Sequence, residues 1–284
     1  MALTIITDSA SDILQTEAKT LGIEVVPLVT IFPDKSYRDG VDISHNQFFE
    51  RLIESDELPT TSQITPHTYG EYFDAALKKG NEVLCLVLSS KLSGCYQSAC
   101  IAQQERSDKP IYVVDTLSAT FGERILVEYA VRLRNEGIEV SKIASMLEEA
   151  KKKVRVVALL DTLEYLKKGG RISATAALAG TLLSIKPVIA LQEGVISLLG
   201  KARGSKNGNN FLIQEIEKSS GIDFDMPFSL AYSGLSDTLL QKYIKDSAHL
   251  YKGIPAEELP VRTIGSTIGT HIGPGAIGVG FFEK

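Results

Sequence analysis

Cysteine is scarce in this 284-residue sequence, and no segment has the pattern of a signal peptide or of a membrane span. The three cysteines, Cys85, Cys95 and Cys100, form no Cys-x-x-Cys pair, and their odd number gives no disulfide framework. The amino terminus has no basic region and an apolar run of only four residues, so we expect no signal peptide. No window approaches the roughly 20 uninterrupted apolar residues that a spanning helix needs. We therefore predict a soluble cytoplasmic protein with no membrane span, and transient contact with a membrane stays open.

The familiar cofactor motifs are also missing. Residues 273–278 match Gly-x-Gly-x-x-Gly, but the six residues that follow leave no room for the helix and the acidic residue of a dinucleotide site. The sequence has no P-loop, no His-Glu-x-x-His motif and no Gly-x-Ser-x-Gly elbow. The four histidines show no metal-ligand spacing. We predict neither a metal nor a cofactor.

Basic residues are not in excess. The formal net charge is −5, whereas a general nucleic-acid-binding protein usually has a strong basic excess. Apolar residues make up 44% of the chain and charged residues 23%, which is ordinary for a globular protein. The length suits two modest domains or one large domain.

Apolar runs alternate with helical patterns in the first half of the chain. The expected strands are residues 3–6, 24–32, 82–90 and 110–115. Ser11 or Asp12 is expected near the start of the first helix, and Ser44 with Gln47 forms a capping box for a later one. This alternation predicts an α/β fold with a mostly parallel sheet and flanking helices.

The pattern changes from about Val154. A strand at 154–161 precedes a helix at 163–171, a helix of small residues at 173–183, and a hairpin formed by 187–191 and 195–203. We predict a two-layer α/β domain with antiparallel character. Because the charged segment 148–153 is the best boundary, the predicted domains are residues 1–153 and 154–284.

Short polar side chains gather in segments that follow the predicted strands. Residues 58–66 read LPTTSQITP, which is either a solvated turn or a site for an oxygen-rich group. Thr7-Asp8-Ser9 and residues 89–99 also follow strands, where parallel α/β sheets bind ligands. Ser93 can cap the next helix, whose first N–H groups favour an anion, and Gly94 permits close approach to the backbone. A plain helix cap is the simpler explanation.

Two glycine-rich segments add cationic or polar groups. Gly169 and Gly170 end a helix just before Arg171, and residues 269–278 form a rigid bend that presents Thr270 and His271. Arginine and histidine beside glycine-rich backbone suit carboxylate or phosphate recognition. The alternative is a surface arginine and a tight turn.

The ordered set of motifs resembles the DegV family, bacterial fatty-acid-binding proteins that serve as binding subunits of fatty acid kinase. The resemblance covers essentially the whole chain and rests on TDSASD (7–12), PTTSQ (59–63), SSKLSGCYQSA (89–99), DTLEYLKKGGRIS (161–173), GKAR (200–203) and IGTHIGPGAIGVGFF (268–282). Two residues depart from the family pattern. Cys95 replaces a usual Thr on the helix wall, where acyl selectivity could differ, and Ile272 replaces a Thr near His271.

The resemblance implies two α/β domains that bury a long-chain fatty acid such as palmitate. It carries the carboxylate site over to Thr61, Ser62, Ser93 and Gly94, with His271 joining through a hydroxyl or water. Burying each methylene stabilises the complex by ~0.8 kcal/mol. A buried carboxylate needs its lone pairs satisfied, and hydroxyl and backbone N–H groups can do this.

Three functions compete at this point. The first is a non-catalytic carrier that presents the fatty acid to the ATP-binding subunit of fatty acid kinase. The second is an acyl hydrolase or transferase with Ser93 as nucleophile, although its motif contains no activating base and only His271 could serve from a distance. The third is a lipid sensor without a kinase. In the carrier, Arg171 and Arg203 are expected to dock the partner or to lie near the phosphoryl group.

Overall fold

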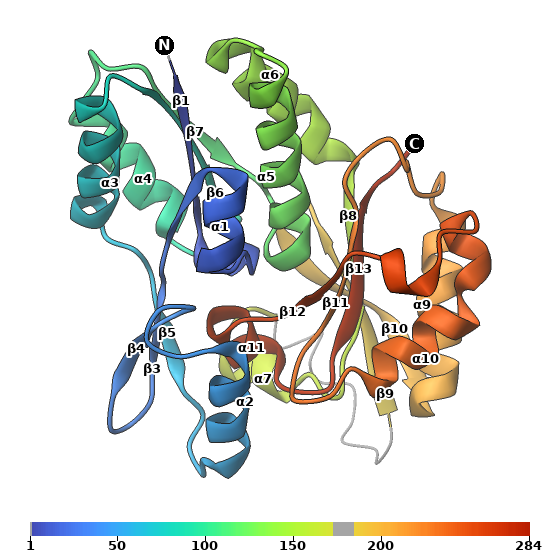
Figure 1. Cartoon of the computed structure of the whole chain (residues 1–284). Coiled ribbons are helices and arrows are strands. Elements are labelled where there is room, and N and C mark those ends of the chain that lie inside the picture. Colours follow the sequence, from blue (N-terminus) through green and yellow to red (C-terminus); the bar gives the residue numbers. More distant parts are fainter. Residues whose placement is uncertain (1, 173–184) are drawn as a thin grey trace.

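The computed structural model describes residues 2–172 and 185–284. Figure 1 shows two large sheets side by side with helix α5 (Thr120–Asn135) between them. This helix contacts β1 and β6 of one sheet and β8, β11 and β13 of the other. Because α5 is buried along most of its length, its apolar side chains join the two halves in one hydrophobic cluster.

The first sheet is parallel throughout, as predicted. Its order is β2-β1-β6-β7, and its strands are β1 (Leu3–Asp8), β2 (Ile23–Val26), β6 (Glu82–Val87) and β7 (Ile111–Asp115). Strand β6 is buried on both faces because helices cover both sides of the sheet. Helices α3 (Pro66–Lys78) and α4 (Cys95–Gln104) cover one face, and α5 with α6 (Val140–Ala150) covers the other.

The second sheet has the predicted antiparallel character. Its order is β10-β9-β8-β13-β11-β12, and only β11 and β12 run parallel. Its strands are β8 (Val154–Leu159), β9 (Ile185–Gln192), β10 (Val195–Arg203), β11 (Ser229–Tyr232), β12 (Val261–Thr263) and β13 (Ile277–Phe282). Helix α9 (Gly204–Lys218) packs on β8, β9 and β10, and α10 (Thr238–Asp246) contacts α9. The predicted β9–β10 hairpin is confirmed.

A third, small sheet corrects two predictions. The expected strand 24–32 breaks at Pro27, so that β2 and β3 (Val29–Ile31) lie in different sheets. The expected loop at 59–63 contains β5 (Thr60–Ser62), which pairs with β3, while β4 (Ser36–Arg38) pairs on the other side. Helix α2 (His45–Glu54) follows with the predicted Ser44–Gln47 capping box. Together these elements have their own apolar cluster, formed by Phe32, Ile43, Phe48, Phe49 and Leu52.

The remaining helices are short. They are α1 (Gln15–Leu21), α7 (Glu164–Lys168), α11 (Ser266–Ile272) and the 3-10 helices Ser9–Ser11, Lys151–Lys153, Ala248–Tyr251 and Ala256–Glu258. The first helix therefore begins at Gln15 and not beside Asp12, whose left-handed backbone (φ 55°) ends the preceding 3-10 turn.

Two further expectations concern the second half of the chain. The predicted bend at 269–278 begins inside helix α11, which ends at Ile272. The predicted helix 173–183 lies outside the described residues. Among the described residues, no helix is long and apolar enough to cross a membrane. The division into residues 1–153 and 154–284 stays a prediction.

Candidate functional site

A cavity of about 510 Å³ lies where the small sheet, the two large sheets and helix α11 meet. Its wall is mainly apolar and includes Ile31, Phe121, Val156, Leu191 and Ile196. Its volume falls in the range of pockets that enclose small molecules. Every residue of the predicted carboxylate site lines it, and so does Arg171. The role of these residues in binding stays a prediction.

Thr61 and His271 are joined directly. Because side chains alternate along a strand, the Thr61 side chain lies on the face of β5 opposite to that of its exposed neighbours Thr60 and Ser62. Its Oγ1 lies 2.8 Å from Nε2 of His271, which the last turn of α11 carries into the cavity wall. Burial, together with the charge of Arg171, lowers the pKa of His271 to about 4. The imidazole is therefore neutral at pH 7.

Gly169 and Arg171 support the other side of the imidazole. A Cβ at Gly169 would lie 2.3 Å from Nδ1 of His271, so only glycine leaves room for the ring. The Arg171 side chain folds back here, donating from Nε to the carbonyl oxygen of Leu92 (3.1 Å) and from Nη1 to that of Gly169 (2.6 Å). These contacts place a guanidinium beside the segment that leads to Ser93.

Gly94, which follows Ser93, lies next to Gln63, the residue that follows strand β5. Ser93 precedes the capping residue Gly94, and its Oγ accepts the N–H of Cys95 (3.3 Å), which corrects the prediction that Ser93 itself is the cap. A Cβ at Gly94 would lie 2.0 Å from Oε1 of Gln63, so the glycine lets this side chain cross the backbone. Gln63 then donates to Ser98 (3.3 Å).

These contacts form a closed series that we call the polar ring. It runs from Thr61 to His271, Gly169, Arg171, Leu92, Ser93, Gly94, Gln63 and back along β5 to Thr61. The ring combines one guanidinium, one neutral imidazole and several hydroxyl and amide groups. Such donors suit a carboxylate or another small anion.

The two departures from the family pattern have different effects. Cys95 does not line the cavity, and its expected effect on acyl selectivity stays a prediction. Its Sγ instead accepts the Ser93 hydroxyl (3.3 Å) and the Ile64 N–H (3.4 Å). Burial raises the pKa of the Cys95 thiol to about 12, so it stays protonated. Ile272 does line the cavity, where it adds apolar surface.

The Thr7-Asp8-Ser9 segment holds the cavity wall without lining it. Asp8 accepts the N–H groups of Ala10 and Leu88 (both 2.9 Å), and the Ser9 hydroxyl accepts the N–H of Leu28 (3.0 Å). Leu28 and Leu88 line the cavity. The segment is buried and structural, so its polar residues fix strand ends and do not face a ligand.

Three acidic side chains are buried behind the cavity wall. Burial raises the pKa of Asp8 to about 7 and that of Asp12 to about 8, and it raises the pKa of Glu123 well above its usual range. Glu123 accepts a bond from Thr7 (2.9 Å), and Asp12 accepts one from Thr120, which has a left-handed backbone (φ 52°).

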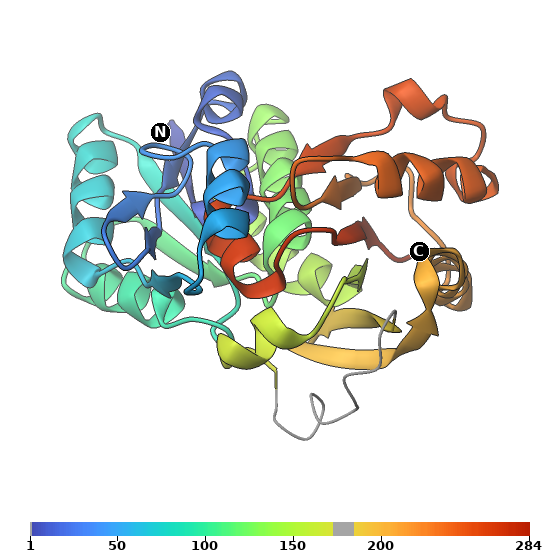
Figure 2. The ribbon, with the colours of Figure 1, turned by 90° about the horizontal axis from the view of Figure 1, so that it is seen from below.

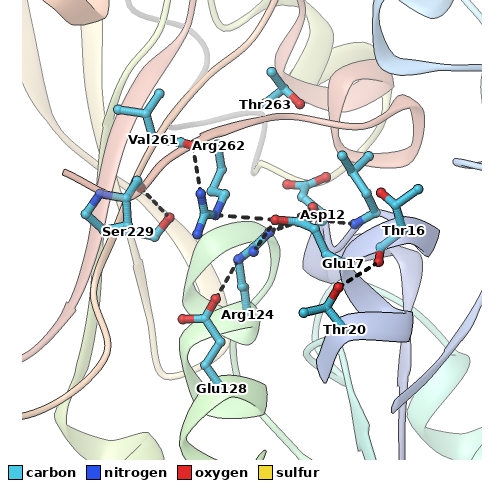
Figure 3. A network of polar contacts seen from close by, with 12 residues as sticks. Asp12, Thr16, Glu17, Thr20, Arg124, Glu128, Ser229, Val261, Arg262 and Thr263 are labelled. Atoms are coloured by element: carbon cyan, nitrogen blue, oxygen red, sulfur yellow. Dashed lines mark hydrogen bonds and ion pairs between the residues drawn. The ribbon is translucent and has the colours of Figure 1, made fainter. Parts of the chain in front are cut away.

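A charged network lies next to these acids (Figure 3). Arg124 donates to Glu17 (2.7 and 3.0 Å), to Glu128 (2.9 Å) and to the carbonyl oxygen of Asp12 (3.3 Å). Arg262 of β12 approaches Glu17 at 3.7 Å. Because Arg124 is buried, its charge requires these partners. The network joins α1 and α5 to the second sheet.

Several predicted or functional features fall outside the cavity wall. Arg203 is exposed at the end of β10 and does not line it. Within the described ranges, no group of three or more acidic, histidine or cysteine side chains is arranged to hold a metal ion. Thr120 and Phe121, by contrast, line the cavity but belong to no motif, because they act through contacts with distant segments that no local pattern reveals.

The fold and the site define an α/β protein whose apolar cavity is closed by a ring of polar groups. The family model described as "Uncharacterised protein, DegV family" matches residues 2–284. A DegV domain-containing protein from Caldanaerobacter subterraneus subsp. tengcongensis is 36% identical over 283 residues, which cover 99% of each chain. The chain belongs to the DegV family.

Two solved structures have folds similar to that of this chain. A DegV family protein from Thermus thermophilus, described for its fatty acid binding, superposes with a TM-score of 0.88 at 34% identity and full coverage of both chains. A stearic acid-binding protein from Eubacterium ventriosum superposes with a TM-score of 0.85 at 26% identity, covering 99% of this chain and 98% of the other.

Proposed function

We propose that the protein is a carrier that binds a long-chain fatty acid such as palmitate in the cavity, with the carboxylate at the polar ring, and presents it to a partner kinase. The observation that carries this proposal is the apolar cavity bordered by Thr61, Ser93, Arg171 and His271. The fatty acids bound by the similar proteins from Thermus and Eubacterium support it.

The energetics of binding favour a long apolar chain. At ~0.8 kcal/mol for each buried methylene, a palmitoyl chain contributes on the order of 10 kcal/mol before the costs of association. The carboxylate must exchange water for protein donors. Thr61 and the Gly94 N–H supply neutral donors, and Arg171 supplies a positive charge. The Ser93 hydroxyl becomes a further donor when it turns from Cys95 Sγ to the carboxylate.

His271 directs the Thr61 hydroxyl in this proposal. A neutral imidazole with its proton on Nε2 donates to Thr61 Oγ1, which frees the hydroxyl hydrogen of Thr61 for the carboxylate. Ser62 lies on the opposite face of β5 and is exposed, so we assign it a smaller contribution.

The surroundings of Ser93 favour a carrier over a hydrolase. Its hydroxyl donates to Cys95 Sγ, and the imidazole of His271 is occupied by Thr61. Within the described part of the chain, no base contacts Ser93, whereas a serine nucleophile needs an adjacent base. The bound acid is therefore expected to leave chemically unchanged unless a partner acts on it.

Phosphorylation of the carboxylate would need a second protein. The sequence contains no P-loop to bind ATP, so a kinase subunit must supply the phosphoryl group. Arg171, in the polar ring, suits the phosphoryl-proximal role, because a guanidinium stabilises a phosphate beside the carboxylate. Arg203 suits docking, because it is exposed and away from the cavity wall.

The proposal is tested by identifying what the protein carries. Protein purified from bacteria is denatured, extracted with organic solvent and analysed by mass spectrometry. We expect about one long-chain fatty acid per chain, in keeping with a single enclosed ligand. Protein that is purified empty and also fails to bind added palmitate or oleate would refute the proposal.

A further inference from the structure

Side chains from the first third of the sequence bind the start of helix α11. Asp39 accepts the N–H (2.9 Å) and the hydroxyl (2.8 Å) of Ser266 through Oδ1, and the N–H of Thr267 (3.2 Å) through Oδ2. Asp12 accepts the N–H of Gly265 (2.8 Å). The first N–H groups of a helix have no partner within it. Two carboxyl groups therefore satisfy three consecutive amides.

The other end of the same helix carries the imidazole of the polar ring. Thr267, Ile268, His271 and Ile272 all line the cavity. Because α11 is a single short helix, a rotation or displacement at its first turn moves His271 as well. The bonds of Asp39 therefore influence where the imidazole lies.

Asp39 also belongs to the part of the molecule that carries Thr61. It directly follows β4, whose small sheet includes β5 with Thr61. Figure 2 shows α2 of this part lying against α11. A Cβ at Gly269 would lie 2.6 Å from the ring of Phe48 and 2.9 Å from that of Phe49, so the two helices are in close contact.

We propose that Asp39 is a positioning residue of the fatty acid site. It ties the small sheet, which holds Thr61, to α11, which holds His271, and so maintains their 2.8 Å contact. This inference rests on the proposed function. The geometry explains why the residue is an acid: Asp39 is only 2% exposed and accepts three hydrogen bonds from one helix start, a role that needs both carboxylate oxygens.

The test uses Asp39→Asn, which preserves the size of the side chain but replaces one acceptor oxygen with a donor. Asp42→Asn is the matched control, because Asp42 lies three residues later and is paired with Arg38 on the surface. Nitrogen NMR of the His271 ring is recorded in lipid-free protein. The Thr61→Val variant gives the reference resonance of an imidazole whose Nε2 has no hydrogen bond to Thr61. We expect Asp39→Asn to move the His271 Nε2 resonance toward that of Thr61→Val, and Asp42→Asn to leave it unchanged.

The affinity for lipid provides a second readout. Asp39→Asn should bind palmitate about 10-fold more weakly, because the Thr61 hydroxyl is no longer held in position to donate to the carboxylate. It should bind methyl palmitate nearly as well as the wild type does. A His271 resonance that stays at its wild-type position in Asp39→Asn overturns the inference. If the wild type binds no palmitate, the proposed function fails, but the lipid-free spectra still decide the role of Asp39.

A gentler variant covers the case in which Asp39→Asn does not fold. Ser266→Ala removes the hydroxyl, which bonds both Asp39 and Oγ1 of Thr30 (2.9 Å), and keeps both N–H bonds to Asp39. Thr30→Val, which removes only the contact with Thr30, is its control. Ser266→Ala should move the His271 resonance in the same direction by a smaller amount. A resonance unchanged from that of the wild type would contradict the positioning role.

Discussion

The hydroxyl of Thr61 lies 2.8 Å from the imidazole of His271, and a proton on Nε2 of this ring leaves the single hydroxyl hydrogen of Thr61 free for a ligand. A protonated His271 would also donate to Thr61, but its charge is disfavoured by burial and by Arg171. The neutral ring therefore leaves Arg171 as the main cation of the polar ring. In the proposed function, directed hydrogen bonds as well as charge would hold the carboxylate.

We expect Thr61→Val and Ser93→Ala each to weaken palmitate binding by ~1–3 kcal/mol, because a buried carboxylate oxygen loses a donor. Both variants should fold normally, since neither side chain supports the hydrophobic clusters. Isothermal titration measures the affinities. Thr60→Val serves as the control, because Thr60 is exposed on the opposite face of β5 and should not affect binding. Unchanged affinity in both test variants would remove these residues from the site.

Phe121 of helix α5 lines the cavity and packs against strand β13. A Cβ at Gly278 or Gly280 would lie 2.5 or 2.6 Å from the ring of Phe121, so the ring rests directly on the strand. Because Gly278 and Gly280 have no side chains, the Phe121 ring lies close to the backbone of β13, which leaves more space in the cavity.

This packing predicts a change in acyl preference. Gly280→Ala should push the Phe121 ring into the cavity and favour shorter acyl chains, whereas Phe121→Leu should relieve the crowding and favour longer ones. Mass spectrometry after incubation with an equimolar mixture of saturated fatty acids gives the distribution for each variant. The double variant should return toward the wild-type distribution. If all three variants retain the wild-type distribution, Phe121 does not limit the cavity.

Sequence patterns correctly predicted the helices and strands that are specified by neighbouring residues. The buried run of β6, the capping box of α2 and the hairpin of β9 and β10 were all read from neighbouring residues. Strand β5 was missed because its three residues are short and polar, and it is a strand only because β3 pairs with it. The bend expected before β13 begins as helix α11 because Asp12 and Asp39 satisfy its first amides from a distance.

The sequence motifs contain the residues that line the cavity but not the contacts that support them, and the role of these residues in binding stays a prediction. Thr61, Ser93 and His271 stand in motifs that resemble a known family, and all line one cavity. No sequence signal linked Gly169 to His271 or Gln63 to Gly94, because these contacts depend on how distant segments pack.

Stability should depend on pH because acids are buried between the two large sheets. Asp8 and Asp12 have pKa values of about 7 and about 8, above the value of about 3.9 for an unfolded aspartate. The folded protein therefore binds protons that the unfolded chain releases between about pH 4 and pH 8, and its stability falls as pH rises through this window. His271, with a pKa of about 4, has the opposite effect, but only below about pH 6.5.

From pH 6.5 to pH 8.5 we expect the free energy of unfolding to fall by on the order of 1 kcal/mol per pH unit. Glu123→Gln should reduce this slope, because a neutral amide replaces a buried acid whose pKa is raised. Urea unfolding at several pH values measures the effect. Glu136→Gln, an exposed position at the end of the same helix, is the control. A slope in Glu123→Gln equal to that of the wild type would contradict this explanation.

The proposed presentation to a kinase would use the surface of the folded protein. We expect Arg203→Ala to leave palmitate affinity unchanged and to slow acyl-phosphate formation by the partner kinase, because Arg203 is exposed and outside the cavity wall. Lys245→Ala removes the same charge from exposed α10 and should have no effect. Rates are compared at sub-saturating carrier. A wild-type rate in Arg203→Ala would exclude a docking role for this arginine.

Carbon-13 NMR of palmitate labelled at its carboxyl carbon examines where the bound head group lies. We expect one resonance for the bound carboxylate, shifted from that of free palmitate and displaced again in Thr61→Val and in Ser93→Ala. Palmitate labelled at its terminal methyl carbon should give the same bound resonance in all three proteins. A bound carboxyl resonance that is identical in the wild type and both variants would show that the carboxylate does not lie at the polar ring.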